Sequence, residues 1–178
     1  MEFKVVIGSW GAYNRAEDDK ALGSDWIDFA EYNSWEEIEE ELKKQGFDLE
    51  GEDEELFIQD IDFDCGDMNG DYTHPKKLFN ILNDSGVMKS EYRYHEMLAY
   101  IEVEDWDEFV ELVEADKDNW DSDIIFREGA DGEDFARDEI KEFVPEDIFK
   151  TLDSYIDYEK WFEDSEAKET EYGVILLV

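Results

Sequence analysis

Alternation of apolar and polar residues predicts several strands along the chain. Residues 3–10 carry apolar side chains at every second position, as a strand with one buried face does. In residues 56–64, the same period places Phe57, Ile61 and Phe63 on one face and three aspartates on the other. Shorter strands are predicted at 26–29, 124–127 and 172–178, the last a continuous apolar run typical of a buried strand.

A period of 3.6 residues predicts helices between these strands. The clearest follows Asp105, which has capping-box spacing to Glu108 and precedes apolar residues at 106, 109, 110 and 113. Ser34 and Glu37 have the same spacing at the start of a helix that Gly46 ends. Further helices are predicted from a cap at Thr73 to residue 84, from a cap at Ser90 to residue 101, at 132–143 and after Pro145.

The order of these elements predicts an α+β fold built from three small domains. No segment rich in Pro, Gly or Ser separates the units, so we expect short connections between them. The expected units are an α+β domain at 1–73, a helical domain at 74–116 and a second α+β domain at 117–178.

The charge of the chain indicates a specialised surface. Its 178 residues include 54 Asp or Glu against 16 Lys or Arg, which gives a net charge of −38. Solubility needs a net charge of only about 2 to 8, and a larger charge opposes the compact state by self-repulsion. Because 15% of the residues are aromatic and 42% are hydrophobic, the chain can still build a core. We therefore predict a folded protein with a strongly acidic surface.

Part of this charge falls in rows on the predicted elements. Residues 45–75 and 94–116 contain no Lys or Arg. Side chains two apart on a strand share a face at a spacing of about 7 Å, and side chains four apart share a helix face. These spacings predict three rows of partner-binding carboxylates: Asp60, Asp62 and Asp64; Asp107, Glu111 and Glu114; and Asp134, Asp138 and Glu142.

Three interpretations of these rows differ in kind. An acidic stripe is usually a solvated face, and the helix after Ser34 fits that, because Glu39 and Glu40 each precede a lysine by four residues. A protein of a salt-loving organism is acidic throughout, whereas here the cations are missing from particular stretches. The third interpretation is a match to the cationic channel of a DNA-binding partner, since DNA carries one charge per about 1.7 Å of duplex.

The sequence lacks the common motifs for catalysis and for metal binding. His74, His95 and Cys65 do not have zinc-site spacing, and no phosphate-binding glycine motif occurs. The aspartates from Asp60 to Asp71 resemble a calcium loop but lack its turn glycine. We expect no enzyme activity, no cofactor and no bound metal.

Composition also predicts where the protein acts. A lone cysteine favours a reducing compartment, and the N-terminus lacks the features of a signal peptide. No stretch approaches the ~20 apolar residues that span a bilayer, and anionic lipids repel an anionic surface. We expect a soluble, cytoplasmic protein whose partner is neither a membrane nor a nucleic acid.

Three stretches of the chain resemble a known family. They are V-I-G-S-W-G-A-Y-N at 6–14, followed by Trp26; E-D-E-E-L-F-I-Q-D at 52–60; and D-F-A-R-D-E-I-K-E at 134–142 together with L-D-S-Y-I-D-Y-E at 152–159. These stretches resemble the ArdA antirestriction proteins of phages and mobile elements, with similar spacing over nearly the whole chain. The middle, residues 74–116, matches only in helical character and acidity.

The resemblance implies a curved, elongated protein of three small domains that forms a homodimer. It implies that the carboxylates mimic the phosphates of bent DNA, and that the protein blocks restriction by binding the DNA-binding groove of a type I restriction–modification enzyme in a bacterial host. It places an antirestriction motif, near the dimer contact, at Tyr155, Ile156, Asp157, Tyr158, Trp161 and Asp164. Aromatic residues at this spacing are also typical of simple helix packing.

Two other functions remain open from the sequence. The acid rows would also suit a DNA mimic that inhibits another defence complex, such as a CRISPR effector. They would equally suit an acidic protein that binds calcium or a polycation. Displacement of DNA from the partner separates mimicry from cation binding.

Overall fold

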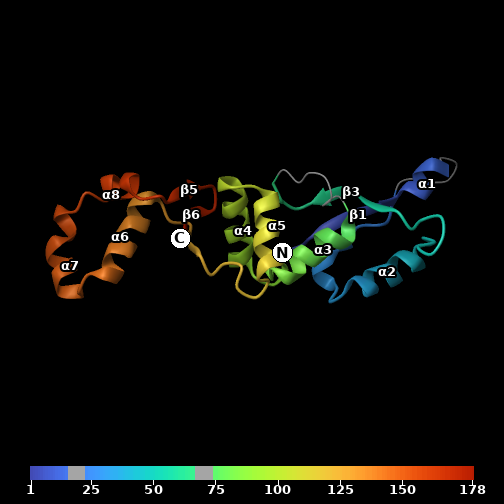
Figure 1. Ribbon diagram of the computed structural model, residues 1–178, viewed down its shortest axis with the longest axis horizontal. Helices are drawn as coiled ribbons and strands as arrows, with labels where there is room; N and C mark the ends of the chain where they lie inside the picture. The colour runs from blue at the N-terminus through green and yellow to red at the C-terminus, as the bar shows by residue number, and fades with distance from the viewer. Residues whose placement is uncertain (16–22, 67–73) are drawn as a thin grey trace.

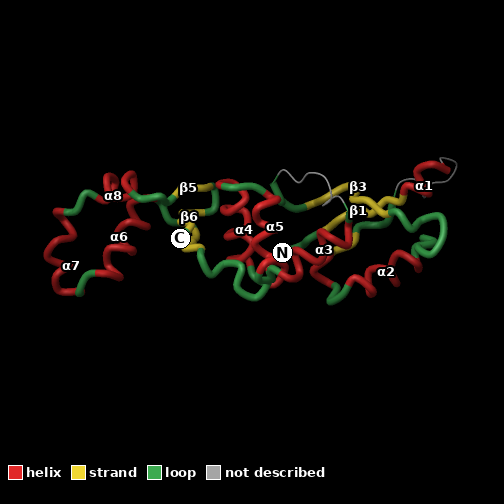
Figure 2. The backbone as a smooth tube through the Cα atoms, in the orientation of Figure 1, coloured by secondary structure: helices red, strands yellow, loops and turns green. Residues whose placement is uncertain are grey.

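The computed structural model describes residues 1–15, 23–66 and 74–178. In that part of the chain the fold is α+β, with eight α-helices and two three-stranded antiparallel sheets. One sheet belongs to the N-terminal half of the chain and the other to the C-terminal half, and two helices, α4 (Glu91–Val103) and α5 (Trp106–Ala115), lie between them (Figures 1 and 2). The predicted α+β class is therefore confirmed.

The N-terminal sheet is built around its first strand. Phe3, Val5 and Ile7 are fully buried on one face, as their alternation predicted. Both neighbouring strands run antiparallel to the first, which lies in the centre. The strands are β1 (Lys4–Ser9), β2 (Ile27–Asp28) and β3 (Leu56–Asp62).

A bulge in β3 changes which side chains share a face. Val6 pairs with Asp60, but the next residue of β1, Ile7, pairs with Ile58, so Gln59 is an extra residue. One extra residue inverts the alternation, and Phe57 therefore lies on the outer face, away from Ile61. The prediction that Phe57 and Ile61 share a face is wrong for this reason. The strand also ends two residues earlier than predicted, at Asp62.

A short helix, α1 (Trp10–Arg15), stands where we predicted the end of the first strand and a turn. Its first turn is fixed by buried Ser9, whose hydroxyl accepts a hydrogen bond from the Ala12 N–H (3.1 Å) and donates one to Asp53 (2.7 Å). The second oxygen of Asp53 accepts from the Asp48 N–H (2.9 Å). This buried network explains why the chain turns into a helix here.

The helix starts were predicted with mixed success. Ser90 and Asp105 accept hydrogen bonds from backbone N–H groups at the starts of α4 (Glu91–Val103) and α5 (Trp106–Ala115), as predicted. Ser34 precedes α2 (Trp35–Lys44) without a capping bond from its side chain. The expected cap Thr73 lies outside the described residues, and His74 accepts from the Lys76 N–H at the start of α3 (Pro75–Asp84).

The C-terminal sheet has the strand order β4–β6–β5. Its strands are β4 (Ile124–Glu128), β5 (Lys168–Thr170) and β6 (Gly173–Leu177). Between β4 and β5 the chain forms three helices, α6 (Gly132–Phe143), α7 (Glu146–Leu152) and α8 (Tyr158–Asp164). Short 3-10 helices occupy Phe29–Glu31, Val87–Lys89 and Asp153–Tyr155. The strand β5 was not predicted, because its sequence K-E-T has no apolar residue.

Most of the buried side chains form a single core. It runs from β1 and β3 through the apolar faces of α2 to α5 and reaches Phe126 of β4 and Ile175 of β6. A second, small core contains Phe135, Ala167 and Val174 and holds α6 against the C-terminal sheet. Packing is therefore continuous across residues 73 and 116, where we placed the domain boundaries. The division into three domains stays a prediction.

Candidate functional site

Nearly all acidic side chains of the described chain lie at the surface. Among the described residues, the buried carboxylates are Asp53, Glu96 and Glu139. The nine carboxylates predicted to bind a partner are all exposed. They differ in whether another group of the protein already holds them.

The row on α5 is the most open. Asp107, Glu111 and Glu114 lie beside the buried stripe that begins with Trp106. Within the described chain, none of the three side chains has a partner for a hydrogen bond or an ion pair. Like charges at these spacings destabilise a helix by about 0.2–0.5 kcal/mol per pair. Stability therefore does not explain this row.

The row predicted on β3 is shorter than expected. Asp60 and Asp62 pair with Val6 and Lys4 and lie on the exposed outer face of the sheet. Asp64 lies beyond the strand, where its carboxylate accepts hydrogen bonds from the Gly66 N–H (3.1 Å) and the Tyr172 hydroxyl (3.0 Å). The prediction that Asp64 continues the strand row is wrong.

The row on α6 divides in a similar way. Asp134 and Asp138 are exposed and have no ion-pair partner within the described chain. Glu142 lies 3.1 Å from the Arg127 guanidinium, which also holds the buried carboxylate of Glu139 at 3.0 Å. Glu142 thus belongs to an internal ion pair that fixes α6 to β4.

Seven of the nine predicted carboxylates therefore remain available to a partner, and we refer to them as the acid rows: Asp60, Asp62, Asp107, Glu111, Glu114, Asp134 and Asp138. Their elements succeed one another along the long axis, from β3 through α5 to α6 (Figure 1). Each row stands on a regular element, so its carboxylates keep a fixed spacing.

Asp64 instead anchors a junction between distant parts of the chain. The Tyr94 hydroxyl donates to the Asp64 carbonyl oxygen (2.8 Å), and Tyr172 donates to its carboxylate. Burial raises the pKa of both tyrosines to about 12; the bond to the Asp64 carboxylate adds to the rise for Tyr172, whereas the bond to the carbonyl oxygen opposes it for Tyr94. His95 stacks on the Tyr172 ring (5.5 Å between centroids) and contacts Glu128 through Nδ1. The junction joins β3, α4 and the C-terminal sheet.

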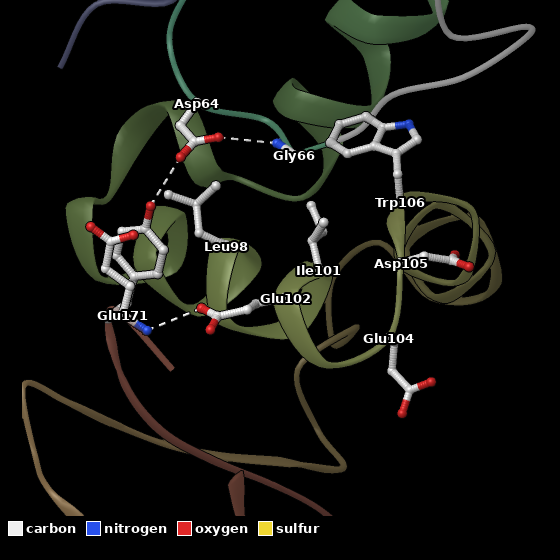
Figure 3. A pocket seen from close by; sticks show the side chains of 10 residues that line it. Asp64, Gly66, Leu98, Ile101, Glu102, Glu104, Asp105, Trp106 and Glu171 are labelled. Atoms are coloured by element: carbon white, nitrogen blue, oxygen red, sulfur yellow. Dashed lines mark hydrogen bonds between the residues drawn. The ribbon is translucent and has the colours of Figure 1, made fainter. Parts of the chain in front are cut away.

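A cavity of about 580 Å³ opens beside this junction (Figure 3). Leu98 and Ile101 of α4 line its base, and Trp106 stands at one side. Glu102 accepts a hydrogen bond from the Glu171 N–H (3.0 Å), which ties α4 to the turn before β6. The described residues that line the cavity include no Lys, Arg, His, Ser or Cys. These residues supply carboxylates but no nucleophile paired with a base.

The segment expected to carry the antirestriction motif consists of a 3-10 turn followed by α8. Tyr158 is buried, and its hydroxyl donates to Asp153 (2.6 Å) while Arg137 stacks on its ring (4.9 Å). Burial, followed by the bond to Asp153, raises the pKa of Tyr158 to about 12. Asp157 caps α8 by accepting from the Lys160 N–H (3.0 Å). These two residues hold the segment itself in place.

Other members of that segment face either inwards or outwards. Trp161 packs on the small C-terminal core, and Asp164 pairs with Lys160 at 3.3 Å. Ile156 is partly exposed, whereas Tyr155 is 84% exposed. Only Tyr155 therefore presents a large, freely accessible ring.

Three further exposed apolar residues lie in the same part of the chain and were not among our predicted contacts. Phe143 at the end of α6 is 81% exposed, and Ile148 and Leu152 of α7 are also exposed. The sequence does not mark them as exposed. Ile148 and Leu152 are four residues apart and share a helix face, which is also the usual pattern of a face packed against a core.

The described residues contain no close group of three or more His, Cys, Asp or Glu side chains that would hold a metal ion. Of the calcium-loop candidates, Asp60 and Asp62 lie on a strand rather than in a loop, and Asp71 is outside the described residues. No helix of the described residues is both long and apolar enough to cross a membrane.

Comparison with known families agrees with the resemblance seen in the sequence. A family model described as antirestriction protein (ArdA) matches residues 5–175 of the 178-residue chain. The match includes both sheets, all eight α-helices of the described chain and every residue of the acid rows. No curated protein matches the chain. The chain belongs to the ArdA family of antirestriction proteins.

Proposed function

We propose that this protein is a non-enzymatic DNA mimic that binds the DNA-binding groove of a type I restriction–modification enzyme. In this role it acts in the cytoplasm of a bacterial host and prevents cleavage of incoming DNA. The family match supports antirestriction activity, and the acid rows supply a physical means for it.

The observation that carries the proposal is the state of the seven carboxylates in the acid rows. They are exposed, fixed on a strand and two helices, and have no ion-pair partner in the described chain. A groove that holds DNA offers Lys and Arg side chains at the positions of phosphates. Fixed carboxylates bind such a groove without first giving up partners of their own, which lowers the cost of association.

We further propose that two protomers associate through the C-terminal part of the chain. Each protomer has a net charge of −38 and repels its twin, so the contact must be apolar or locally balanced in charge. The exposed side chains of Phe143, Ile148, Leu152 and Tyr155 supply such a surface. A dimer would lengthen the row of charges and give it two-fold symmetry, as many DNA sites have.

A cleavage assay tests the main proposal. A purified type I enzyme is given its unmodified DNA substrate with increasing amounts of the protein, and the uncut DNA is recovered. We expect cleavage to stop, and we expect the recovered DNA to be cut fully by fresh enzyme once the protein is removed. Resistance of DNA that has been incubated with the protein alone would indicate an enzyme that alters DNA, and unimpeded cleavage in the mixture would refute the proposed target.

A further inference from the structure

Helix α1 lies at the end of the molecule opposite α7 (Figure 1), and two of its aromatic rings form a cluster with a ring of β3. We call Trp10, Tyr13 and Phe57 the aromatic patch. Trp10 is 46% exposed and Tyr13 is 60% exposed. Large aromatic side chains in such a position are enriched at binding sites, where Trp, Tyr and Arg carry most of the affinity.

The patch is rigid. Trp10 stacks on Phe57 with 4.5 Å between ring centroids, and Tyr13 meets Trp10 edge-on at 5.7 Å. Phe57 covers Gly8, where an added Cβ would come within 2.4 Å of the Phe57 ring. The bulge at Gln59 brings Phe57 to this outer face, and the buried bond between Ser9 and Asp53 fixes the helix that carries the other two rings.

Acidic residues stand on β3 and on the stretch before it, next to the elements that carry the patch. Asp60 follows Phe57 on the same outer face of β3 and is exposed. The backbone N–H of Trp10 donates to the Glu55 carbonyl oxygen (3.0 Å), which brings the start of α1 against a stretch that includes exposed Glu54 and Glu55. A ring face next to fixed negative charge attracts a cation more strongly than either group does alone.

Among the side chains that the structure describes, which exclude that of Arg15, no cation lies over these rings. The cation–π pairs in that part of the protein are Arg93 over Trp120 (5.7 Å) and Arg137 over Tyr158 (4.9 Å), both far along the chain from the patch. In both pairs the cation is an arginine and the ring is buried. The patch thus offers the same kind of ring, but at an exposed position.

We propose that the aromatic patch binds arginine side chains on the cationic surface of the protein's partner, with a guanidinium on the rings and the neighbouring carboxylates as its acceptors. Arginine fits better than lysine, because its planar, weakly hydrated guanidinium stacks on aromatic faces. A phosphate mimic alone would need only charge, so the patch adds a contact that DNA does not make. The identity of the partner rests on the proposed function, but the chemistry of the patch does not.

The first test uses a simple cation. The whole protein, labelled with 5-fluorotryptophan, is titrated with an arginine octapeptide and with a lysine octapeptide, and fluorine NMR follows the Trp10 signal, identified from Trp10→Leu. We expect the arginine peptide to shift the Trp10 signal at a lower concentration than the lysine peptide, with buried Trp35 and Trp120 unaffected. Equal responses to the two peptides, or none at Trp10, would overturn the proposal.

Matched variants make the test specific to the ring. Tyr13→Phe keeps a ring, whereas Tyr13→Leu keeps only apolar bulk at an exposed position. We expect the leucine variant to bind the arginine peptide about two- to fivefold more weakly, as exposed cation–π contacts predict, and the phenylalanine variant to bind as the unmodified protein does. Equal binding by both variants would contradict ring-specific recognition.

The second test uses a purified type I enzyme. Tyr13→Leu should lower affinity by a similar factor at every salt concentration, because loss of a stacked ring leaves the number of screened charges unchanged. If the unmodified protein fails to bind the enzyme, the proposed target is wrong while the peptide result still decides the chemistry of the patch. If the enzyme binds and Tyr13→Leu changes nothing, the patch is not a partner contact.

Discussion

Helices α2 and α5 have the same length and a similar buried face, yet their acidic residues are in different states. Each has ten residues and begins with a buried tryptophan. On α2 two of the acids have partners within the protein, because Lys44 lies 3.1 Å from Glu41 and the Trp35 indole N–H donates to Glu39 (2.7 Å). On α5 the row formed by Asp107, Glu111 and Glu114 has none in the described chain.

The comparison separates the requirements of folding from those of binding. The apolar stripe of each helix supplies its packing, and the outer face is then free to vary. On α2 that face is the ordinary solvated kind, whereas on α5 it carries repulsion that the protein itself does not relieve. We take the unrelieved face as the one that evolved for a partner.

The expected pairs on α2 were nevertheless wrong in detail. We predicted that Glu39 and Glu40 each pair with the lysine four residues later. Glu39 instead accepts a hydrogen bond from the indole N–H of Trp35 (2.7 Å), so Lys43 turns to Glu50 in the following loop. Lys44 reaches back three residues to Glu41.

The largest effect on binding is expected when several carboxylates of the acid rows are neutralised together. Asp60→Asn, Asp62→Asn, Asp107→Asn, Glu111→Gln and Glu114→Gln, combined in one variant, should weaken binding to a type I enzyme by about 1–5 kcal/mol, at about 0.2–1 kcal/mol per screened contact. Calorimetric titration at moderate salt gives the measurement.

A matched control comes from acids that already have partners within the protein. Glu39→Gln, Glu41→Gln and Glu50→Gln, whose carboxylates contact Trp35, Lys44 and Lys43, remove the same charge as the three changes on α5. We expect this control to keep most of the affinity, whereas Asp107→Asn, Glu111→Gln and Glu114→Gln together weaken binding by about 0.6–3 kcal/mol. Equal losses in the two triple variants would mean that net charge, and not its arrangement, governs binding.

The next largest effect is expected on stability, from a buried acid that, unlike the acid rows, does not face solvent. Glu96 of α4 is 3% exposed, and burial, followed by repulsion from Asp121 and opposed by Arg93, raises the pKa of its carboxyl to about 7. Because this pKa lies above the ordinary value of 4.5, the folded state favours the protonated carboxyl. The free energy of unfolding is therefore highest below pH 4.5 and falls as the pH rises through about 7.

Glu96→Gln keeps the neutral form at every pH. At a pH of about 8 it should be more stable than the unmodified protein by about 1–3 kcal/mol, and at a pH of about 4 the two should be alike. Thermal unfolding followed by circular dichroism at several pH values provides the measurement. A difference that does not change with pH would show that Glu96 is not protonated in the folded protein.

Substitutions in the proposed dimer contact are expected to have an intermediate effect, on the strength of the dimer. Phe143→Ser with Tyr155→Ser removes two exposed rings and should weaken the dimer about tenfold or more, as loss of interface aromatics does. Salt should strengthen the unmodified dimer, because it screens the repulsion between the protomers. Sedimentation at rising salt measures both effects, and a monomer under all conditions would refute the proposed contact.

The smallest effect is expected from a single carboxylate. Asp107→Asn should weaken binding by less than about 1 kcal/mol, because affinity is spread over many screened contacts. It should leave the fold intact, since the side chain of Asp107 has no partner in the described chain. Complete loss of activity from this one change would instead point to a discrete site.

Local features of the fold were predictable from sequence, and contacts between distant segments were not. The caps at Ser90 and Asp105 depend on residues three positions apart, and the buried face of β1 depends on alternation alone. The bulge at Gln59 depends on pairing with β1, about fifty residues earlier, and the sequence of β3 carries no sign of it.

The same reasoning applies to the candidate site. Seven of the nine predicted carboxylates are exposed without an ion-pair partner in the described chain, because helix and strand periodicity determine which face they occupy. Asp64 was misassigned because its partner Tyr172 is 108 residues away, and Glu142 because Arg127 comes from another element. Periodicity places a side chain on a face but does not say which distant group will meet it there.

Displacement of a fluorescent DNA duplex from a type I restriction–modification enzyme tests the central claim most directly. Fluorescence anisotropy follows the bound duplex while the protein is added at several salt concentrations. The proposal predicts that the duplex is released in simple competition, and that the protein's own affinity falls as salt rises because its charge pairs are screened. A duplex that stays bound at saturating protein would contradict mimicry of DNA in that groove.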